Sequence, residues 1–396
     1  MNMNEQMKES EESILHTYNR FPVVFEKGQG CYLYDSEGKE YLDFAAGIAV
    51  NSLGYHYPGY DEALKDQIDK LMHISNLYYN EPIIEAGAKL VKAGKMSKAF
   101  FTNSGTEAIE GALKAAKKYA YVRDGHADHE IIAMNHSFHG RSIGALSVTG
   151  TAHYREPFEP LMGGVKFADF NNLESVKAQI TDKTCAIITE VVQGEGGIYP
   201  AKKEFLEGLR QICDEKDIML IFDEIQCGMG RTGHYFAWQA YGVQPDIMTS
   251  AKALGCGVPV GAFVLSEKAA KASLEPGDHG TTYGGNPFVC AAVSKVFDIY
   301  ENDKIIEHVQ EMTPYLEQKL DEIVAKHECA ATRRGMGFMQ GIVIQGRSVG
   351  EVVKAALAKG LLVISAGSDV LRIVPPLVIT KEHIDKMAAI LDECME

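Results

Sequence analysis

Short apolar segments alternate with amphipathic segments through the middle of the chain, between about residues 97 and 266. Each apolar segment is rich in β-branched or aromatic residues and is bounded by polar or glycine-rich turns, as is typical of strands covered on both faces. The predicted strands are 99–102, 131–135, 185–192, 218–223, 246–249 and 261–266. Helical periodicity predicts helices at 105–122, 202–216 and 286–300. This alternation predicts an α/β fold with a mostly parallel sheet between helices.

The two ends of the chain have a different pattern. Between Gly30 and Phe44, two alternating segments flank a turn at 36–38, as in a β-hairpin. Because a single core stops growing at roughly 250–300 residues, a chain of 396 residues is expected to form two domains. We predict a large domain at 51–300 and a smaller α+β domain formed by 301–396 together with the N-terminal segment 1–50. After about residue 300 the predicted helices are 304–326, 349–359 and 381–395, and short strands such as 341–344 and 371–374 separate them.

The composition argues against several classes of protein. A formal net charge of −15 opposes binding to nucleic acid or to an anionic membrane, since both attract basic surfaces. The N-terminal stretch is polar and acidic, unlike a signal peptide, and no run of about 18 apolar residues occurs that could span a bilayer. The eight cysteines are scattered without a CxxC pair, which indicates reduced thiols. We therefore expect a cytoplasmic protein that binds neither nucleic acid nor membrane.

A lysine stands where a predicted strand runs into a glycine-rich turn, at Lys252 in the segment 246–261. Parallel-sheet proteins bind their ligands at such strand ends. The amine of a lysine can form a Schiff base with an aldehyde once burial or a nearby cation makes its neutral form accessible. A solvated surface lysine is the simpler interpretation, and this segment by itself favours it.

A carboxylate ends another predicted strand, at Asp223. A carboxylate in this place can keep a pyridine nitrogen protonated, and the charged ring then acts as an electron sink. The alternative is that Asp223 is the N-cap of a following helix.

Small polar residues connect a third strand to a helix, at Ser104, Gly105 and Thr106. Free backbone N–H groups and hydroxyls at such a helix start suit a phosphate group. Ser104 with Glu107 is also an ordinary capping box, so this segment by itself is a weak signal.

The segment after the strand 131–135 offers an aromatic ring and a guanidinium, at Phe138 and Arg141. The ring of Phe138 could lie on a flat cofactor, and Arg141 could bind a carboxylate through two hydrogen bonds.

Two pairs of histidines, each three residues apart, raise the alternative of a zinc site. One pair lies in a polar loop, and no cysteine stands near either pair, so we predict no metal. The pairs are His126 with His129 and His136 with His139.

Six characteristic segments occur in the order NSGTEA, FHGR, EVVQGEGG, FDEIQCGMGRTG, SAKALG and HGTTYGGNP. Together they resemble the class III aminotransferases, of the ornithine and acetylornithine type, in the fold-type I pyridoxal-phosphate superfamily. The resemblance extends from about Tyr18 to Ile379, nearly the whole chain. It implies a fold-type I transferase with a large cofactor-binding domain, a smaller α+β domain and pyridoxal 5′-phosphate as cofactor.

The resemblance also implies the cofactor contacts. Lys252 would form the Schiff base and shuttle the proton of the reaction, and Asp223 would hold the pyridinium. Thr282 would reach the phosphate in the neighbouring subunit, which implies a homodimer with shared active sites. The other implied contacts are Ser104, Gly105 and Thr106 to the phosphate, Phe138 to the ring face and Gln226 to the ring hydroxyl.

Substrate contacts are implied in the same way. Arg141 resembles the family's clamp for the α-carboxylate of an acylated diamino acid, and Arg372 resembles its second carboxylate-binding arginine. Glu195 would cover Arg372 in one half-reaction and release it when glutamate binds in the other; a structural ion pair is the alternative. Thr281 and Tyr18 are further implied substrate contacts.

The amine donor is indicated by the segments around Tyr18 and Gly47, which most resemble acetylornithine-type members. Ornithine aminotransferases tend to have a tyrosine where Gly47 leaves room for an acyl group. The resemblance thus implies transfer of the distal amino group of N2-acetylornithine to 2-oxoglutarate in arginine biosynthesis, by a ping-pong mechanism between pyridoxal and pyridoxamine phosphate. Two departures from the family pattern, neither of which removes a catalytic atom, are Val191 in place of proline and Cys227 in place of threonine.

Other functions stay open. Ornithine, succinylornithine or 4-aminobutyrate could be the amine donor, and an aminomutase would move the amine within one molecule without 2-oxoglutarate. The non-enzyme alternative is a regulatory paralogue that binds pyridoxal phosphate without turnover. Such a paralogue is marked by loss of Lys252, Asp223 or Arg141, and all three are present.

Overall fold

The largest sheet of the protein has seven strands in the order β4-β12-β11-β10-β7-β5-β6. All of them run parallel except β12, which pairs antiparallel with both β4 and β11. This confirms the prediction of a mostly parallel sheet. The strands are β4 (Lys98–Thr102), β5 (Glu130–Met134), β6 (Val165–Ala168), β7 (Thr184–Glu190), β10 (Met219–Asp223), β11 (Ile247–Ser250) and β12 (Gly261–Leu265).

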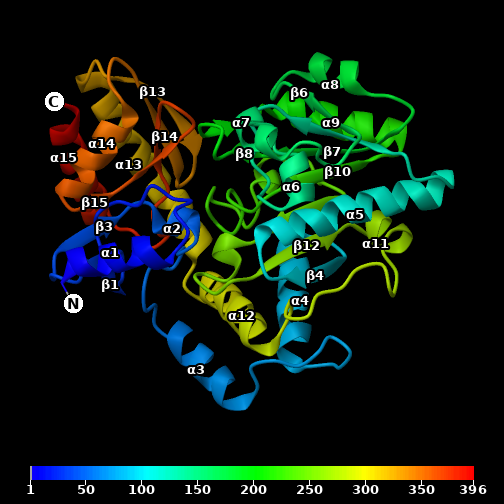
Figure 1. Ribbon diagram of the computed structural model, residues 1–396, viewed down its shortest axis with the longest axis horizontal. Coiled ribbons are helices and arrows are strands. Elements are labelled where there is room, and N and C mark those ends of the chain that lie inside the picture. Colours follow the sequence, from blue (N-terminus) through cyan, green and yellow to red (C-terminus); the bar gives the residue numbers. More distant parts are fainter. Residues whose placement is uncertain (1) are drawn as a thin grey trace.

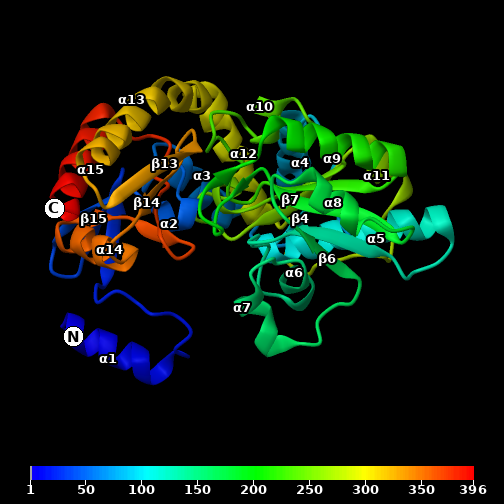
Figure 2. The same cartoon turned by 90° about the horizontal axis from the view of Figure 1, so that it is seen from above.

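Side chains of the central strands point alternately into two apolar cores. In β10, Met219 and Ile221 pack in the core that contains α5, whereas Leu220 and Phe222 pack in the core that contains α9. The sheet is therefore covered on both faces, as the continuous apolar runs predicted (Figure 2). The helices of this part are α3 (Tyr60–Lys70), α4 (Glu81–Gly94), α5 (Gly105–Asp124), α6 (Ile143–Ser147), α7 (Ala152–Arg155), α8 (Leu173–Gln179), α9 (Lys203–Lys216), α10 (Trp238–Tyr241), α11 (Glu267–Ala272) and α12 (Pro287–Asn302).

The N-terminal hairpin and the C-terminal part of the chain lie side by side (Figure 1). Strands β1 (Phe25–Gln29), β2 (Tyr32–Asp35) and β3 (Glu40–Asp43) form a sheet with β15 (Leu361–Leu362). The predicted hairpin is present, because β2 pairs antiparallel with β3. The other elements here are α13 (Ile305–Lys326), β13 (Ala330–Met336), β14 (Met339–Ile344), α14 (Val349–Ala358), β16 (Ile364–Ala366), β17 (Val370–Ile373) and α15 (Lys381–Met395). The domain boundaries at residues 50 and 300 stay a prediction.

Helix α1 (Met3–Ser13) is set apart from the rest of the molecule (Figure 2). None of its residues is buried, because its polar sequence has no apolar face to pack. The structure is a computed structural model that describes residues 2–396, so Met1 of the predicted segment 1–50 lies outside it. Over the described range, no helix is long and apolar enough to cross a membrane. The remaining short elements are α2 (Ala46–Ala49), η1 (Glu156–Phe158), β8 (Val192–Gln193), β9 (Tyr199–Pro200) and η2 (Lys252–Leu254).

Candidate active site

The candidate site forms at the edge of the large sheet where its parallel strands end. Asp223 is the last residue of β10, and in the sheet register it lies beside Glu190, the last residue of β7. On its other side lies Thr249 of β11, the strand that leads into Lys252. Neighbouring strand ends thus bring their side chains together at the edge where parallel α/β sheets bind ligands.

A cavity of about 500 Å³ opens at this edge. Segments that lie far apart in the sequence supply its walls, so the fold itself assembles the predicted group. The predicted residues that line the cavity are Ser104, Gly105, Thr106, Phe138, Arg141, Glu195, Asp223, Gln226 and Lys252.

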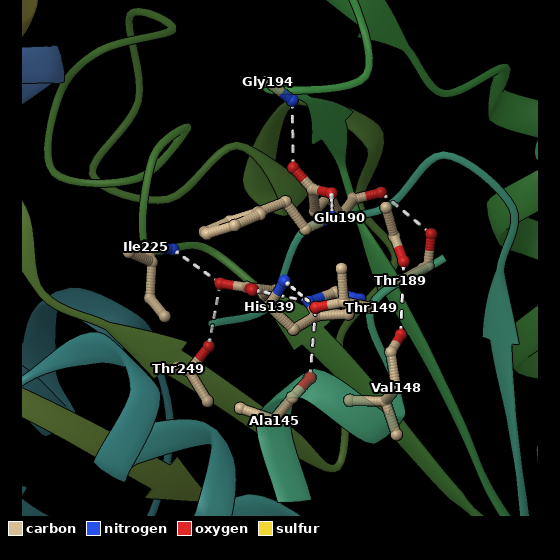
Figure 3. A network of polar contacts seen from close by, with 12 residues as sticks. His139, Ala145, Val148, Thr149, Thr189, Glu190, Gly194, Ile225 and Thr249 are labelled. Atoms are coloured by element: carbon tan, nitrogen blue, oxygen red, sulfur yellow. Dashed lines mark hydrogen bonds and ion pairs between the residues drawn. The ribbon is translucent and has the colours of Figure 1, made fainter. Parts of the chain in front are cut away.

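Both carboxylate oxygens of Asp223 are held in place by His139, Ile225 and Thr249, and these three partners are labelled in Figure 3. One oxygen, Oδ2, lies 2.7 Å from Nδ1 of His139. The other, Oδ1, accepts hydrogen bonds from the N–H of Ile225 at 3.0 Å and from the hydroxyl of Thr249 at 3.1 Å. The carboxylate is only 4% exposed, so its orientation toward the cavity is fixed by its partners.

Lys252 follows β11 in a left-handed backbone conformation with a φ of 46°, which is strained for a residue that has a side chain. Burial lowers the pKa of its amine; the charge of Glu195 opposes this shift, and the charge of Arg372 adds to it. A lowered pKa makes the neutral amine accessible, as attack on an aldehyde requires. Because Lys252 is half-buried and lines the cavity, it is not the solvated surface lysine of the simpler interpretation.

Helix α5 begins at the cavity with Ser104 as its N-cap, whose hydroxyl accepts a hydrogen bond from the N–H of Glu107 at 3.4 Å. The carboxylate of Glu107 accepts a hydrogen bond from the N–H of Asn103 at 2.7 Å. Ser104 is therefore the N-cap, as expected, but Glu107 binds the N–H of Asn103 and not that of Ser104, so the full capping box is not formed. The cap does not exclude anion binding, since a long helix still offers free N–H groups and the positive end of its dipole. A Cβ atom on Gly105 would lie 2.9 Å from Ile225, so only glycine fits here without a shift.

Arg372 of β17 is 3% exposed and binds Glu195 through both carboxylate oxygens, at 2.5 and 3.3 Å. Gln226 joins the pair: its Oε1 accepts a hydrogen bond from Arg372 at 3.1 Å, and its Nε2 donates to Glu195 at 3.3 Å. Burial raises the pKa of Glu195, but the charge and hydrogen bonds of Arg372 outweigh burial and lower the pKa overall. In this arrangement Glu195 occupies the guanidinium that a substrate carboxylate would need.

Arg141 is exposed, and its guanidinium lies over two aromatic rings, that of Phe138, which lines the cavity, and that of Tyr154, which does not. Its Cζ atom is 4.1 Å from the ring centroid of Tyr154 and 5.5 Å from that of Phe138. Cation–π attraction of this kind holds a guanidinium without neutralising it. Across residues 2–396, no carboxylate forms an ion pair with Arg141, so its charge is available to a ligand.

Thr281, Thr282 and Tyr18 do not line the cavity. The hydroxyl of Thr281 accepts a hydrogen bond from Asn103, which does line it, at 3.2 Å. Thr282 is exposed, and Tyr18 is 71% exposed. The roles implied for these three residues stay predictions.

One of the histidine pairs considered for a metal belongs to an ion-pair network. Asp124, His126 and His129 could offer ligand atoms within 4.8 Å of one another. However, Arg123 donates to both oxygens of Asp124 at 2.6 Å, and the rings of His126 and His129 are stacked with an interplanar angle of 16°. A bound guanidinium repels a metal cation, and stacked rings do not aim their nitrogen lone pairs at one point. Ion pairing therefore accounts for this group.

Glu190 is a site residue that sequence reasoning missed. Its Oε1 accepts a hydrogen bond from the N–H of Phe138 at 3.0 Å, and its Oε2 accepts one from Gly194 at 2.9 Å (Figure 3). Burial raises the pKa of Glu190 to about 7, against the opposing effect of His139. The strand-end rule that identified Asp223 also applies to Glu190, but the predicted strand 185–192 extended past the true end and hid it. The contact of His139 with Asp223 was missed because the two lie 84 positions apart.

The residues of the cavity fit pyridoxal 5′-phosphate. Asp223 offers a fixed carboxylate to the ring nitrogen, Lys252 offers an amine to the aldehyde, and the start of α5 offers N–H groups to the phosphate. A volume of about 500 Å³ is also within the usual size of a cofactor cavity.

Comparison with known proteins gives the same picture. The family model for class III aminotransferases matches residues 14–395. An acetylornithine aminotransferase of Clostridium acetobutylicum is 47% identical over 98% of this chain and 100% of its own length. A succinylornithine transaminase of Yersinia pseudotuberculosis is 44% identical over 94% of this chain and 92% of its own. Among solved structures, an ornithine aminotransferase from Toxoplasma gondii superposes with a TM-score of 0.95 at 28% identity, covering 100% of this chain and 95% of that one.

The family match spans nearly the whole chain, and the cavity contains a lysine, a carboxylate and a phosphate cradle that suit one cofactor. The chain therefore belongs to the class III aminotransferases and is a fold-type I, pyridoxal-phosphate-dependent transaminase.

Proposed function

We propose that this aminotransferase transfers the distal amino group of N2-acetylornithine to 2-oxoglutarate in arginine biosynthesis. The observation that carries the proposal is the closed pair of Glu195 with Arg372 beside Lys252. A substrate that presents a distal amine has no carboxylate near that amine, so it needs Arg372 to be covered. Glutamate presents its α-amine, so its neighbouring carboxylate needs Arg372 to be free.

Pyridoxal phosphate supplies an aldehyde that accepts the amino group and a ring that withdraws electrons from the reacting carbon. Residues of the chain bind and orient the cofactor and transfer the proton. Lys252 holds the cofactor and moves the proton at the reacting carbon, and Asp223 keeps the ring nitrogen protonated. Phe138 covers one face of the ring and Gln226 contacts its hydroxyl. The start of α5, at Ser104, Gly105 and Thr106, binds the phosphate.

The other end of the donor is bound by Arg141. Its guanidinium is unpaired and close to the cavity mouth, so it suits the α-carboxylate of an acylated diamino acid. The acyl group needs space next to that carboxylate. We propose that Gly47 leaves this space. Gly47 does not itself line the cavity, but it has a left-handed φ of 64° and stands three residues before Val50, which does. Thr281 and Tyr18 are proposed as further substrate contacts.

Two measurements test the proposal. Borohydride reduction followed by peptide mapping is expected to find the cofactor on Lys252, and a label on any other lysine overturns the assignment. The cofactor absorbance is then recorded while acetylornithine, succinylornithine, ornithine and 4-aminobutyrate are added one at a time. Acetylornithine is expected to convert the cofactor most efficiently. When 2-oxoglutarate is omitted, formation of the product from acetylornithine is expected to stop after one conversion per active site. Faster conversion by another donor transfers the assignment to that donor, and sustained turnover without 2-oxoglutarate indicates an aminomutase.

A homodimer with shared active sites is part of the proposal, with Thr282 of each subunit reaching the phosphate of the other. Large apolar side chains next to Thr282 support it: Tyr283 is 61% exposed and Leu77 is 87% exposed. Asn76 links their two segments by a hydrogen bond to the carbonyl of Gly284 at 2.8 Å. Large exposed apolar side chains that lie together on a surface mark an interaction site.

Sedimentation of a Leu77→Asp variant tests the dimer. We expect it to shift the protein toward monomer and to weaken cofactor binding, because the phosphate loses Thr282. The matched control is Leu15→Asp, at a residue that is 82% exposed elsewhere on the chain, and it is expected to leave the dimer intact. Dimers of unchanged strength in both variants contradict the interface.

We also place the enzyme in the cytoplasm and assign 1–50 and 301–396 to its smaller domain.

A further inference from the structure

Glu190 is a buried carboxylate, only 5% exposed, and both of its oxygens are occupied by backbone N–H groups. One N–H belongs to Phe138, in the loop that follows β5, and the other belongs to Gly194, which directly follows the short strand β8. Figure 3 shows the contact of Glu190 with Gly194. The carboxylate therefore connects the segment after β5 to the segment after β8, beside a second link, a hydrogen bond from Nε2 of Gln193 to the carbonyl of Asn135 at 2.9 Å.

Each of these loops carries a residue that the proposed function uses. Phe138 itself lines the cofactor cavity, and Gly194 directly precedes Glu195, the residue that covers Arg372. Gly194 is also tightly packed, since a Cβ atom on it would lie 2.3 Å from Gln226. A small movement of Gly194 would therefore move the partners of Arg372 as well.

A second buried carboxylate provides a comparison. Glu224 is fully buried and likewise accepts two backbone hydrogen bonds, from Ala237 and Trp238, both at 2.8 Å. Both of its partners lie at the start of α10, away from the loops of Phe138 and Gly194. Glu224 is thus a buried carboxylate like Glu190, with one further contact, a hydrogen bond from Sγ of Cys227 at 3.4 Å, and with a different place in the fold.

We propose that Glu190 is a positioning residue: it ties the loop of Phe138 to the loop of Glu195 and thereby holds Glu195 over Arg372 for distal-amine donors. The inference rests on the proposed function. Glu190 lines the cavity, but both of its carboxylate oxygens are occupied by backbone N–H groups. We therefore assign its effect to the positions of Phe138 and Glu195 and not to a direct contact with the reacting atoms.

The Glu190→Gln variant tests the bridge. Glutamine has nearly the same shape but only one acceptor oxygen, so one buried N–H loses its partner. Loss of a buried partner of this kind typically changes an equilibrium by about tenfold. With Glu195 less firmly held, Arg372 is free more often. We expect the ratio of kcat/KM for glutamate to kcat/KM for acetylornithine, measured in separate half-reactions, to rise about tenfold.

Hydrogen–deuterium exchange of the cofactor-free protein gives a readout that does not depend on activity. Glu190→Gln is expected to speed exchange in the peptides that contain Phe138 and Gly194 and to leave those of Ala237 and Trp238 protected. Glu224→Gln is the matched control. It is expected to speed exchange in the peptides of Ala237 and Trp238, to leave those of Phe138 and Gly194 protected, and to leave the half-reaction ratio unchanged. If Glu190→Gln does not fold, Glu190→Asp, whose two acceptors are drawn back by one methylene group, is expected to show smaller changes in the same direction.

The inference is overturned if the Glu190 variant has the same half-reaction ratio and the same exchange pattern as wild type. It is also overturned if the variant matches the Glu224 control in both measurements. That result would leave the proposed function untouched, because labelling of Lys252 and the donor panel decide it separately. Conversely, a label on another lysine would remove the proposed function and leave the exchange result standing as a structural fact about Glu190.

Discussion

His139 and Asp223 face each other inside the protein, with Nδ1 of the imidazole 2.7 Å from Oδ2 of the carboxylate. His139 is 2% exposed, and its other nitrogen, Nε2, has no hydrogen-bond partner among residues 2–396. The imidazole therefore depends on this one contact, and it binds the carboxylate oxygen that Ile225 and Thr249 do not contact.

The Asp223→Asn variant is expected to lose about a hundredfold in the rate of the donor half-reaction, since a charge-assisted hydrogen bond to the cofactor ring is lost. His139→Ala is expected to lose about tenfold, because it removes one orienting contact but keeps the charge. Stopped-flow absorbance of the cofactor measures both rates. Equal losses in the two variants would contradict the distinction between a residue that contacts the cofactor and one that positions it.

The pair of Glu195 with Arg372 predicts opposite effects on the two substrates. Glu195→Gln keeps the side-chain shape but removes the ion pair. We expect the kcat/KM for acetylornithine to fall about tenfold, while that for glutamate stays the same or rises. Half-reaction kinetics with each substrate check this. A parallel fall for both substrates would identify the pair as a purely structural ion pair.

Gly47 predicts the choice between acylated and free ornithine. Gly47→Tyr is expected to fill the space for the acyl group and to lower the kcat/KM for acetylornithine at least about tenfold relative to ornithine, because overfilling a close-packed site costs about 1–3 kcal/mol. Gly38→Tyr is the control, since Gly38 also has a positive φ, of 85°, but lies in the turn of the hairpin with open space around it. Both variants carry the backbone cost of a side chain in this conformation, about 1–2 kcal/mol. If the donor preference of Gly47→Tyr matches that of the control, Gly47 does not set specificity.

Buried carboxylates predict how stability depends on pH. Burial raises the pKa of both Glu190 and Glu224 from 4.5 to about 7. Between these values the folded state binds more protons than the unfolded state, so the free energy of unfolding falls as the pH rises through the window from about 4.5 to 7.

Urea denaturation of the cofactor-free protein at pH 5 and pH 8 measures this fall. A variant with both Glu190→Gln and Glu224→Gln has no proton to lose at these positions, so it is expected to lose less stability over the same interval than wild type. A fall as large as that of wild type would show that other groups cause it.

Much of the fold was predictable because it depends on local sequence. A strand covered on both faces must be apolar throughout, so strands such as β10 were evident from their composition. Strand β6, with the sequence Val-Lys-Phe-Ala, was not predicted, because it lies at the edge of the sheet, where only one neighbour and partial burial are needed. The antiparallel direction of β12 was not predicted either, since direction is set by pairing and leaves no mark on the strand itself.

In the site, too, some features follow from local sequence and others from contacts between distant segments. Lys252, Asp223 and the start of α5 each stand at or just after the end of an apolar strand, which is a local signal. By itself this signal left a simpler interpretation open for each of them, and the resemblance to the family assigned their roles. The pairing of Glu195 with Arg372, 177 positions away, was implied by the family resemblance and by no local pattern, and the tertiary structure makes the contact. The contacts of Glu190 with Phe138 and Gly194 were evident only in the tertiary structure. Contacts of this kind are decided by how strands are ordered in the sheet and how the small C-terminal sheet packs beside it. The sequence determines which chemical groups are available, and packing determines which of them meet.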